Sequence, residues 1–149
     1  MLTREYEKSK IRSFVIHIIS DKISTLEKFI NFTREAAREI KKTPKYDTFR
    51  EEAHEEIFHM ERQLNELNKL NRKMSRVLNT KTTFVQLGSL VITNKARFYI
   101  SVSLGQFFYE GDRMYAISEE SPMAQTMLGK TIGDEFVLNN IQQKIVEIF

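Results

Sequence analysis

The side chains best suited to chemistry in this 149-residue chain are carboxylates that follow one internal break, Thr43-Pro44-Lys45-Tyr46. Asp47 and Glu51 come directly after the break and are four residues apart, which places both on one face of a helix. Carboxylate oxygens are the ligands that Mg²⁺ prefers. The pattern is compatible with a polar tip that meets a metal-and-phosphate site.

The charges around the break also have a purely structural explanation. Basic residues precede or occupy it, and acidic residues follow it: Arg34, Arg38, Lys41, Lys42 and Lys45, then Asp47, Glu51, Glu52, Glu55 and Glu56. If the break joins two antiparallel helices, these two blocks face one another and form ion pairs between the helices. Such pairs contribute little individually. Charge pattern alone favours this explanation over a functional one.

Other catalytic signatures fail on spacing or composition. His54 and His59 resemble a metalloprotease motif, but they are five residues apart, whereas a zinc-binding pair on a helix needs a spacing of four. The chain has no cysteine, which excludes disulfides, thiolate metal sites and cysteine nucleophiles. No glycine-rich phosphate loop and no nucleophile–base set is recognisable. We therefore expect no self-contained active site, no cofactor of the protein's own, and no enzyme activity.

Two long helices must position the break. Apolar or small residues alternate at spacings of four and three on both sides of it: Ile19, Ile23, Leu26, Ile30, Thr33, Ala37 and Ile40, then Ala53, Ile57, Met60, Leu64, Leu67, Asn71, Met74 and Leu78. This alternation is typical of a coiled-coil seam. Because Pro44 disfavours a helix at the residue before it, the break predicts an antiparallel hairpin with its tip at about 41–48. Asp47 or Thr48 is then expected to cap the second helix.

The hairpin is expected to fill residues 1–80, with arms of roughly 30 residues, or about 45 Å. Near its start the apolar face widens at Ile11, Phe14, Val15, Ile18 and Ile19. That width suits packing against a second domain. An amphipathic helix on a membrane surface is the weaker alternative, because the polar face carries acidic residues among its lysines.

Residues 81–149 predict a small β-rich domain. Alternating apolar residues indicate strands at 89–93, 97–103, 107–109, 114–117, 135–138 and 141–148, with turns at 94–96, 110–112 and 139–140. Ser121, Pro122 and Gly129 are placed as the N-cap, first residue and end of one short helix. The expected fold class is α+β: a long antiparallel coiled-coil hairpin followed by a small antiparallel β-sheet domain with one short helix.

Composition indicates a folded cytoplasmic protein. Hydrophobic residues make up 41% of the chain and charged residues 29%, with a formal net charge of +3. No apolar run approaches the length of a membrane span, and the charged first ten residues lack the apolar core of a signal peptide. We expect a monomer that is not associated with a membrane.

Two segments of the second half resemble the Gre transcript-cleavage factor family of bacteria. Residues 116–135, AISEESPMAQTMLGKTIGDE, resemble the family pattern I-S-x-x-S-P-[IL]-[GA]-x-x-[LI]-[LI]-G-K-x-x-G-D-E. Residues 87–92, LGSLVI, are similar to the family's opening FGS-x-V-x-V. In the first half the resemblance is mainly architectural, a hairpin with a tip.

This resemblance implies a partner, bacterial RNA polymerase. In the family, an FKBP-like C-terminal domain sits at the mouth of the polymerase's secondary channel, and the coiled coil reaches down it towards the nascent RNA 3′ end. Two acidic residues at the tip help to hold a second Mg²⁺, so that the polymerase cleaves its own backtracked RNA by two-metal chemistry. The resemblance also implies that Ser121, Pro122, Met123 and Ala124 contact the polymerase. The FKBP-like label describes a fold and does not carry isomerase activity.

The tip departs from the family pattern G-D-x-x-E-[NT]. Thr43–Thr48 aligns with it, which places Pro44 at the first acid and Asp47 at the second, flanking Lys45 and Tyr46. Proline has no ligand atom for a metal, and Glu51 would sit back from the tip. The resemblance therefore implies channel binding with cleavage stimulation reduced or absent, and at most a transient Mg²⁺ at Asp47, shared with the polymerase.

Three alternatives stay open. The first is an active cleavage-stimulating factor that uses Asp47 with Glu51. The second is a coiled-coil adaptor unrelated to polymerase, which would form a dimer or complex through the Ile11–Ile19 face. The third is direct DNA or RNA binding, which ranks last because basic and acidic residues are interleaved and no aromatic stacking platform is evident.

Overall fold

The computed structural model describes residues 4–149, and the chain divides into two compact units. The hairpin unit is His17–Asn71, and the sheet unit combines Met1–Ile16 with Arg72–Phe149. This division differs from the boundary expected near residue 80. The reason is that the first turns of the first helix pack within the sheet unit: Ile11 and Val15 are fully buried, and the ring of Phe14 lies 5.4 Å from that of Tyr109.

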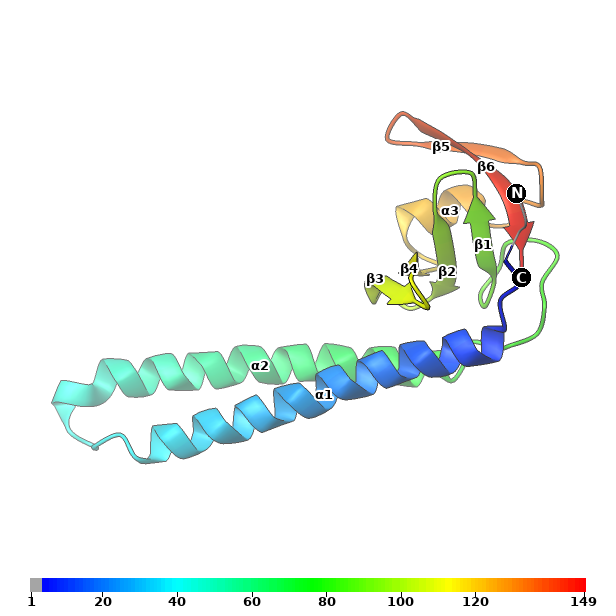
Figure 1. Cartoon of the computed structure of the whole chain (residues 1–149). Coiled ribbons are helices and arrows are strands. Elements are labelled where there is room, and N and C mark those ends of the chain that lie inside the picture. The colour runs from blue at the N-terminus through cyan, green and yellow to red at the C-terminus, as the bar shows by residue number, and fades with distance from the viewer. Residues whose placement is uncertain (1–3) are drawn as a thin grey trace. The chain divides into compact units, whose positions relative to one another are not determined.

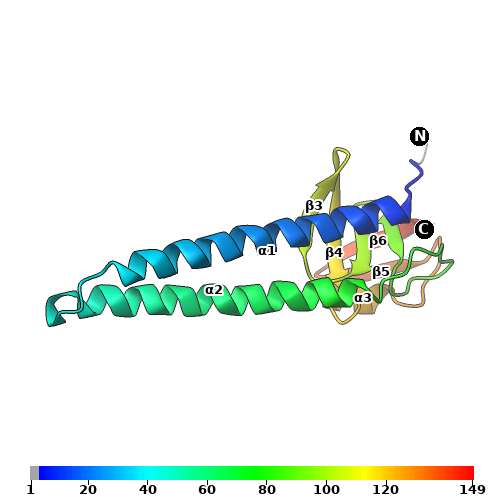
Figure 2. The ribbon, with the colours of Figure 1, turned by 90° about the horizontal axis from the view of Figure 1, so that it is seen from below.

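The predicted hairpin is confirmed. Helix α1 (Lys8–Arg38), the short 3₁₀ helix η1 (Pro44–Tyr46) and helix α2 (Asp47–Met74) follow one another, and α1 and α2 lie side by side in both ribbon views (Figures 1 and 2). Every predicted seam position from Ile19 to Ile40, and from Ala53 to Leu67, is buried or half-buried. Neither α1 nor α2 holds an apolar stretch long enough to cross a membrane, nor does any other helix in residues 4–149.

The seam prediction is wrong at the end of the second arm. Asn71 and Leu78 are both exposed, whereas Met74 is fully buried. Helix α2 ends at Met74, and the next amides bond three residues back, as in Val77 N–H to Met74 O at 3.1 Å. This tighter turn changes the direction of the side chains, so Val77 and not Leu78 is buried.

The sheet unit holds six strands in the order β3-β4-β2-β1-β6-β5 (Figure 1). Their bounds are β1 (Leu90–Thr93), β2 (Arg97–Ser101), β3 (Gly105–Tyr109), β4 (Asp112–Ser118), β5 (Glu135–Leu138) and β6 (Ile141–Ile148). Helix α3 (Pro122–Met127) is capped by Ser121, whose Oγ accepts a hydrogen bond from Ala124 N–H at 3.1 Å. The α+β class and the helix start are therefore confirmed.

The sheet is mixed, which corrects the expectation of an antiparallel sheet. Strands β2 and β4 pair in parallel, while the other four pairings are antiparallel. The physical reason is that β3 pairs with β4 and not with β2, so the chain crosses over before it returns beside β2. Parallel neighbours need such a crossover connection.

A compact apolar core lies under α3. Its buried members come from the strands, from α3 and from the loop before β1: Val85, Val91, Phe98, Ile100, Ala124, Met127, Phe136, Ile145 and Ile148. Helix α3 contacts β4 and β5. This core fixes the position of the segment that resembles the polymerase-contacting motif.

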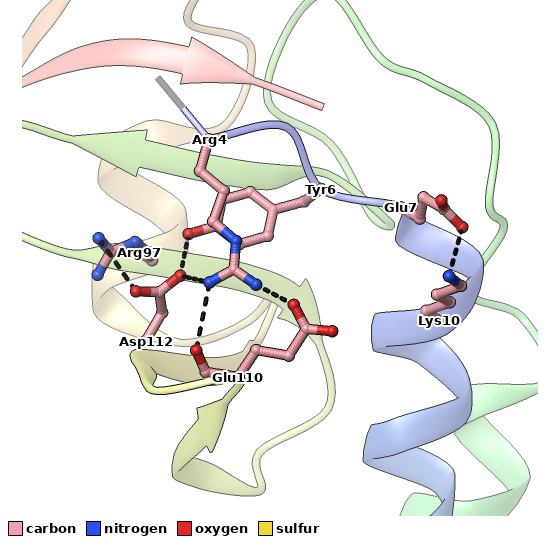
Figure 3. A network of polar contacts seen from close by, with 7 residues as sticks. All are labelled: Arg4, Tyr6, Glu7, Lys10, Arg97, Glu110 and Asp112. Carbon is pink, nitrogen blue, oxygen red and sulfur yellow. Dashed lines mark hydrogen bonds and ion pairs between the residues drawn. The ribbon is translucent and has the colours of Figure 1, made fainter. Parts of the chain in front are cut away.

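The chain before α1 is held to the β3–β4 turn by a polar network (Figure 3). The Arg4 guanidinium pairs with the carboxylates of Glu110 and Asp112, and the Tyr6 hydroxyl donates to Asp112 Oδ2 at 2.6 Å. The hydrogen bond from Tyr6, together with the positive charges of Arg97 and Arg4, lowers the pKa of Asp112. The segment that leads into α1 is thus anchored to the sheet unit.

Lys8 is a buried cation without a carboxylate partner among residues 4–149. Its ammonium donates to Gly88 O at 2.8 Å and to Phe149 O at 3.1 Å, and the residue is 6% exposed. Burial lowers the pKa of Lys8 to about 8, from 10.5. Between these two values the folded state loses the proton while the unfolded state keeps it. Stability linked to Lys8 therefore rises with pH across this range.

We predict that the Lys8→Met variant lacks this rise. The free energy of unfolding, measured by urea denaturation from pH 7.5 to 9.5, should increase in the wild type relative to the variant. The slope of that difference should stay below the limit of about 1.4 kcal/mol per pH unit for one linked proton. The range ends at 9.5 because burial raises the pKa of Tyr99 to about 12, and stability linked to it falls above pH 10. Parallel pH profiles would contradict the prediction.

Candidate functional site: the hairpin tip

The tip is a tight connection between α1 and α2. Helix α1 frays through three-residue turns, as in Ile40 N–H to Ala37 O at 3.3 Å, and Thr43 is extended. Pro44 then opens η1 at a position where a missing N–H does no harm. The predicted cap at Asp47 or Thr48 is wrong. Asp47 is already helical (φ −57°, ψ −43°), so η1 runs directly into α2.

Arg50 organises this connection. Its guanidinium donates to Lys41 O at 2.5 Å and to Thr43 O at 3.3 Å, and it also pairs with the Asp47 carboxylate. Both carbonyls lie in the connection beyond α1, and each also accepts a backbone hydrogen bond: Lys41 O from Thr43 N–H at 2.9 Å and Thr43 O from Tyr46 N–H at 3.0 Å. The Tyr46 ring lies 6.2 Å from that of Phe49 and 5.6 Å from the Lys45 ammonium. The Arg50 side chain therefore contacts residues on both sides of η1.

The predicted tip residues face solvent. Pro44, Lys45 and Asp47 are exposed, Tyr46 is half-buried, and η1 has no buried residue. Glu51 is exposed one turn further along α2. The tip is therefore accessible to a partner.

The tip side chains do not fit a Mg²⁺ site by themselves. Asp47 offers the only carboxylate beside Pro44, and Arg50 pairs with it. Across residues 4–149, no three histidine, aspartate or glutamate side chains form a metal-binding group. His54 lines a hollow beside Arg50, and the ring of His59 lies 6.0 Å from that of Phe58. Octahedral Mg²⁺ needs several oxygen ligands.

The four residues predicted to contact a partner lie at the start of α3. Pro122 is exposed, Ser121 and Met123 are half-buried, and Ala124 is fully buried in the core. The Ser121 hydroxyl serves as the helix cap. Of the four residues, Pro122 has the largest exposed fraction and Ala124 has none.

Local structure explains much of the motif in residues 116–135. Gly129 adopts φ 81° and its N–H bonds to Val85 O at 2.8 Å, while Gly133 adopts φ 93°. The Asp134 carboxylate accepts from Thr131 N–H at 2.8 Å and closes the turn at 131–134, which contains Gly133. These residue types therefore build the fold around α3, whether or not a partner binds there.

Sequence reasoning missed two features of the tip: the role of Arg50 and a hollow between the two arms. A signal for Arg50 exists, because the seam series, extended three residues back from Ala53, reaches position 50. A charged residue at a seam position predicts a specific polar contact. The hollow had no such signal, since it depends on how far the arms diverge.

Comparisons with known proteins leave the family open. No protein-family model matches the chain, and no curated protein matches it. A solved structure described as that of the transcription factor Gfh1 is similar over 99% of both chains, with 18% sequence identity and a TM-score of 0.32. A similarity of this size does not assign the chain to a family or a function.

We predict that Arg50→Ala loosens the tip. Loss of the contacts to Lys41 O and Thr43 O should speed cleavage by the lysine-specific protease Lys-C at the tip lysines by roughly fivefold, the effect of about 1 kcal/mol of local stability. The control is Arg62→Ala, which removes an exposed arginine from the same helix. Equal cleavage rates in the two variants would show that Arg50 does not hold the tip.

Proposed function

We propose that this protein regulates transcription by binding bacterial RNA polymerase, with its hairpin unit in the secondary channel and its stimulation of transcript cleavage reduced or lost. Any cleavage would be the polymerase's own reaction, with the tip near the nascent RNA 3′ end. The motif resemblance of residues 116–135 and 87–92 supports the choice of partner. The solvent-exposed tip supports the mode of action.

The proposed loss of cleavage stimulation rests on the side chains at the tip. Pro44 stands where the resemblance places the first acid, and Asp47, at the second, is paired with Arg50. In two-metal catalysis, one ion activates the attacking water and the other stabilises the leaving oxygen. A tip with one carboxylate, which also pairs with Arg50, adds little to the binding of a second ion. The protein would then act by occupying the channel.

An active cleavage factor remains the second candidate, because Asp47 and Glu51 are both exposed. The coiled-coil adaptor, which predicts a dimer or complex through the Ile11–Ile19 face, is less favoured. Its expected interface, the Ile11–Ile19 face, is occupied within the chain itself, since Ile11, Val15 and Ile19 are all fully buried.

We predict that the purified protein co-purifies with bacterial core RNA polymerase, and that an excess of a Gre factor displaces it. Competition follows because both would use the same channel. A protein that does not bind, or that binds equally well in the presence of the competitor, would overturn the proposed function.

We predict that the wild type stimulates little RNA cleavage in a backtracked elongation complex with Mg²⁺, and that Pro44→Asp gains activity. Adding Arg50→Gln to Pro44→Asp should increase the gain, because it frees the Asp47 carboxylate. The control is Pro44→Ala, which removes the ring without adding a ligand. The length of the labelled RNA is the readout.

The same assay separates the two candidate functions. Strong cleavage by the wild type that Asp47→Ala abolishes would favour the active factor. If neither Pro44→Asp nor the double variant gains activity while both still bind polymerase, the tip does not reach the catalytic centre.

A further inference from the structure

A hollow of about 380 Å³ opens between the two arms of the hairpin unit, next to the tip. Its lining comes from the end of α1, the connection and the start of α2: Arg34, Ala37, Arg38, Ile40, Lys42, Arg50, His54 and Ile57. We call it the tip groove. Its volume falls in the range of small-molecule sites.

The tip groove carries an excess of positive charge. Four of its eight lining residues are arginine or lysine, and none is acidic. Arg34 pairs with Glu61 and Arg50 with Asp47, whereas Arg38 and Lys42 form no ion pair within residues 4–149. Two cations that converge on one hollow without carboxylate partners favour a ligand with more than one negative charge.

The rest of the lining is apolar. Ala37, Ile40 and Ile57 belong to the seam, and each keeps part of its surface accessible, as most seam residues do. A small alanine at position 37 leaves space where a larger seam residue would contact the other arm. An apolar surface beside arginine side chains suits a flat ring, because guanidinium groups stack on aromatic faces. His54 adds a side chain that can donate or accept a hydrogen bond.

We infer that the tip groove binds a nucleoside polyphosphate, with the phosphates on Arg38 and Lys42 and the base against Ala37, Ile40 and Ile57. A simple polyanion would use only the charged part of the lining, and a neutral aromatic molecule only the apolar part. The ligand that uses both carries a ring and several phosphates on one small frame.

Nucleotide binding in the tip groove would not require a polymerase. The tip groove lies wholly within the hairpin unit, and the isolated full chain contains every lining residue. A nucleotide bound there would contact both arms and the connection, because Lys42 lies in the connection and Arg38 and His54 lie on different helices.

Isothermal titration of the full-length protein with ATP, tripolyphosphate and adenosine at low salt tests the inference. ATP should bind more tightly than tripolyphosphate, adenosine should show no binding, and ATP affinity should fall as salt rises. Equal affinity for ATP and tripolyphosphate would reduce the site to a nonspecific polyanion surface and overturn the nucleotide assignment. No binding of ATP would overturn it entirely.

Variants of the two unpaired cations test where the phosphates of the nucleotide bind. Arg38→Gln and Lys42→Gln should each weaken ATP binding by about threefold, and together by about tenfold, as expected for partly exposed charge pairs. The matched control is Lys28→Gln, an exposed cation of α1 outside the groove, which should leave the affinity unchanged. Equal losses in Lys28→Gln and Arg38→Gln would show that overall charge, and not the groove, binds the nucleotide.

A variant that fills part of the tip groove tests where the base of the nucleotide binds. Ala37→Leu places extra apolar volume in the groove and leaves every cation, so it should weaken ATP binding and leave tripolyphosphate binding unchanged. Circular dichroism checks that the helices stay folded. A folded Ala37→Leu protein that binds ATP like the wild type would contradict a base bound at this position.

Discussion

The hairpin unit depends on one narrow seam of apolar contacts. With only two helices in this unit, each helix turns a single strip of side chains inwards and leaves the rest to solvent. Burial along that strip must offset the entropy of ordering both arms. Of the seam positions from Ile19 to Ile40, only Ile19 and Ile30 are fully buried, and the others, including Ala37 and Ile40 beside the tip, are half-buried. Polar contacts supplement the seam near the tip, where Arg34 pairs with Glu61 and Arg50 donates to the carbonyls of Lys41 and Thr43.

Arg50 bears on both the structure of the tip and the proposed function. The same guanidinium that bonds to the carbonyls of Lys41 and Thr43 also pairs with Asp47. A well-ordered tip and a free carboxylate are therefore competing requirements in this sequence. Together with Pro44, this pairing leaves the tip with few carboxylate oxygens for a metal ion, as proposed for a protein that acts by occupying the channel. It also explains how a hairpin of the expected shape could serve a partner without contributing to its chemistry.

Local sequence patterns predicted the helices, strands and turns well. They did not predict which strands pair, or which residues distant in the sequence come into contact. The alternating seam gave both helices, the Ser121-Pro122 start gave α3, and Asn139-Asn140, both with positive φ, gave the last turn. Those signals lie within a few residues of the structure they specify. The parallel pairing of β2 with β4 has no such local signal, because a period of two identifies strands but not their neighbours. Burial of Lys8 likewise depends on residues 80 and 141 positions away, and the partner surface at Ser121–Ala124 stays a prediction.

The strand order has a consequence for how the sheet unit forms as the chain is made. Strand β1 lies in the middle of the sheet between β2 and β6, yet β6 is the last strand to leave the ribosome. Until it arrives, β1 exposes one unpaired edge, and β5 has no neighbour at all. The two arms of the hairpin unit meet through contacts between earlier residues and can pair first. Nascent chains should therefore pass through a stage with a finished hairpin and an open sheet, the stage at which a chaperone would have most to protect.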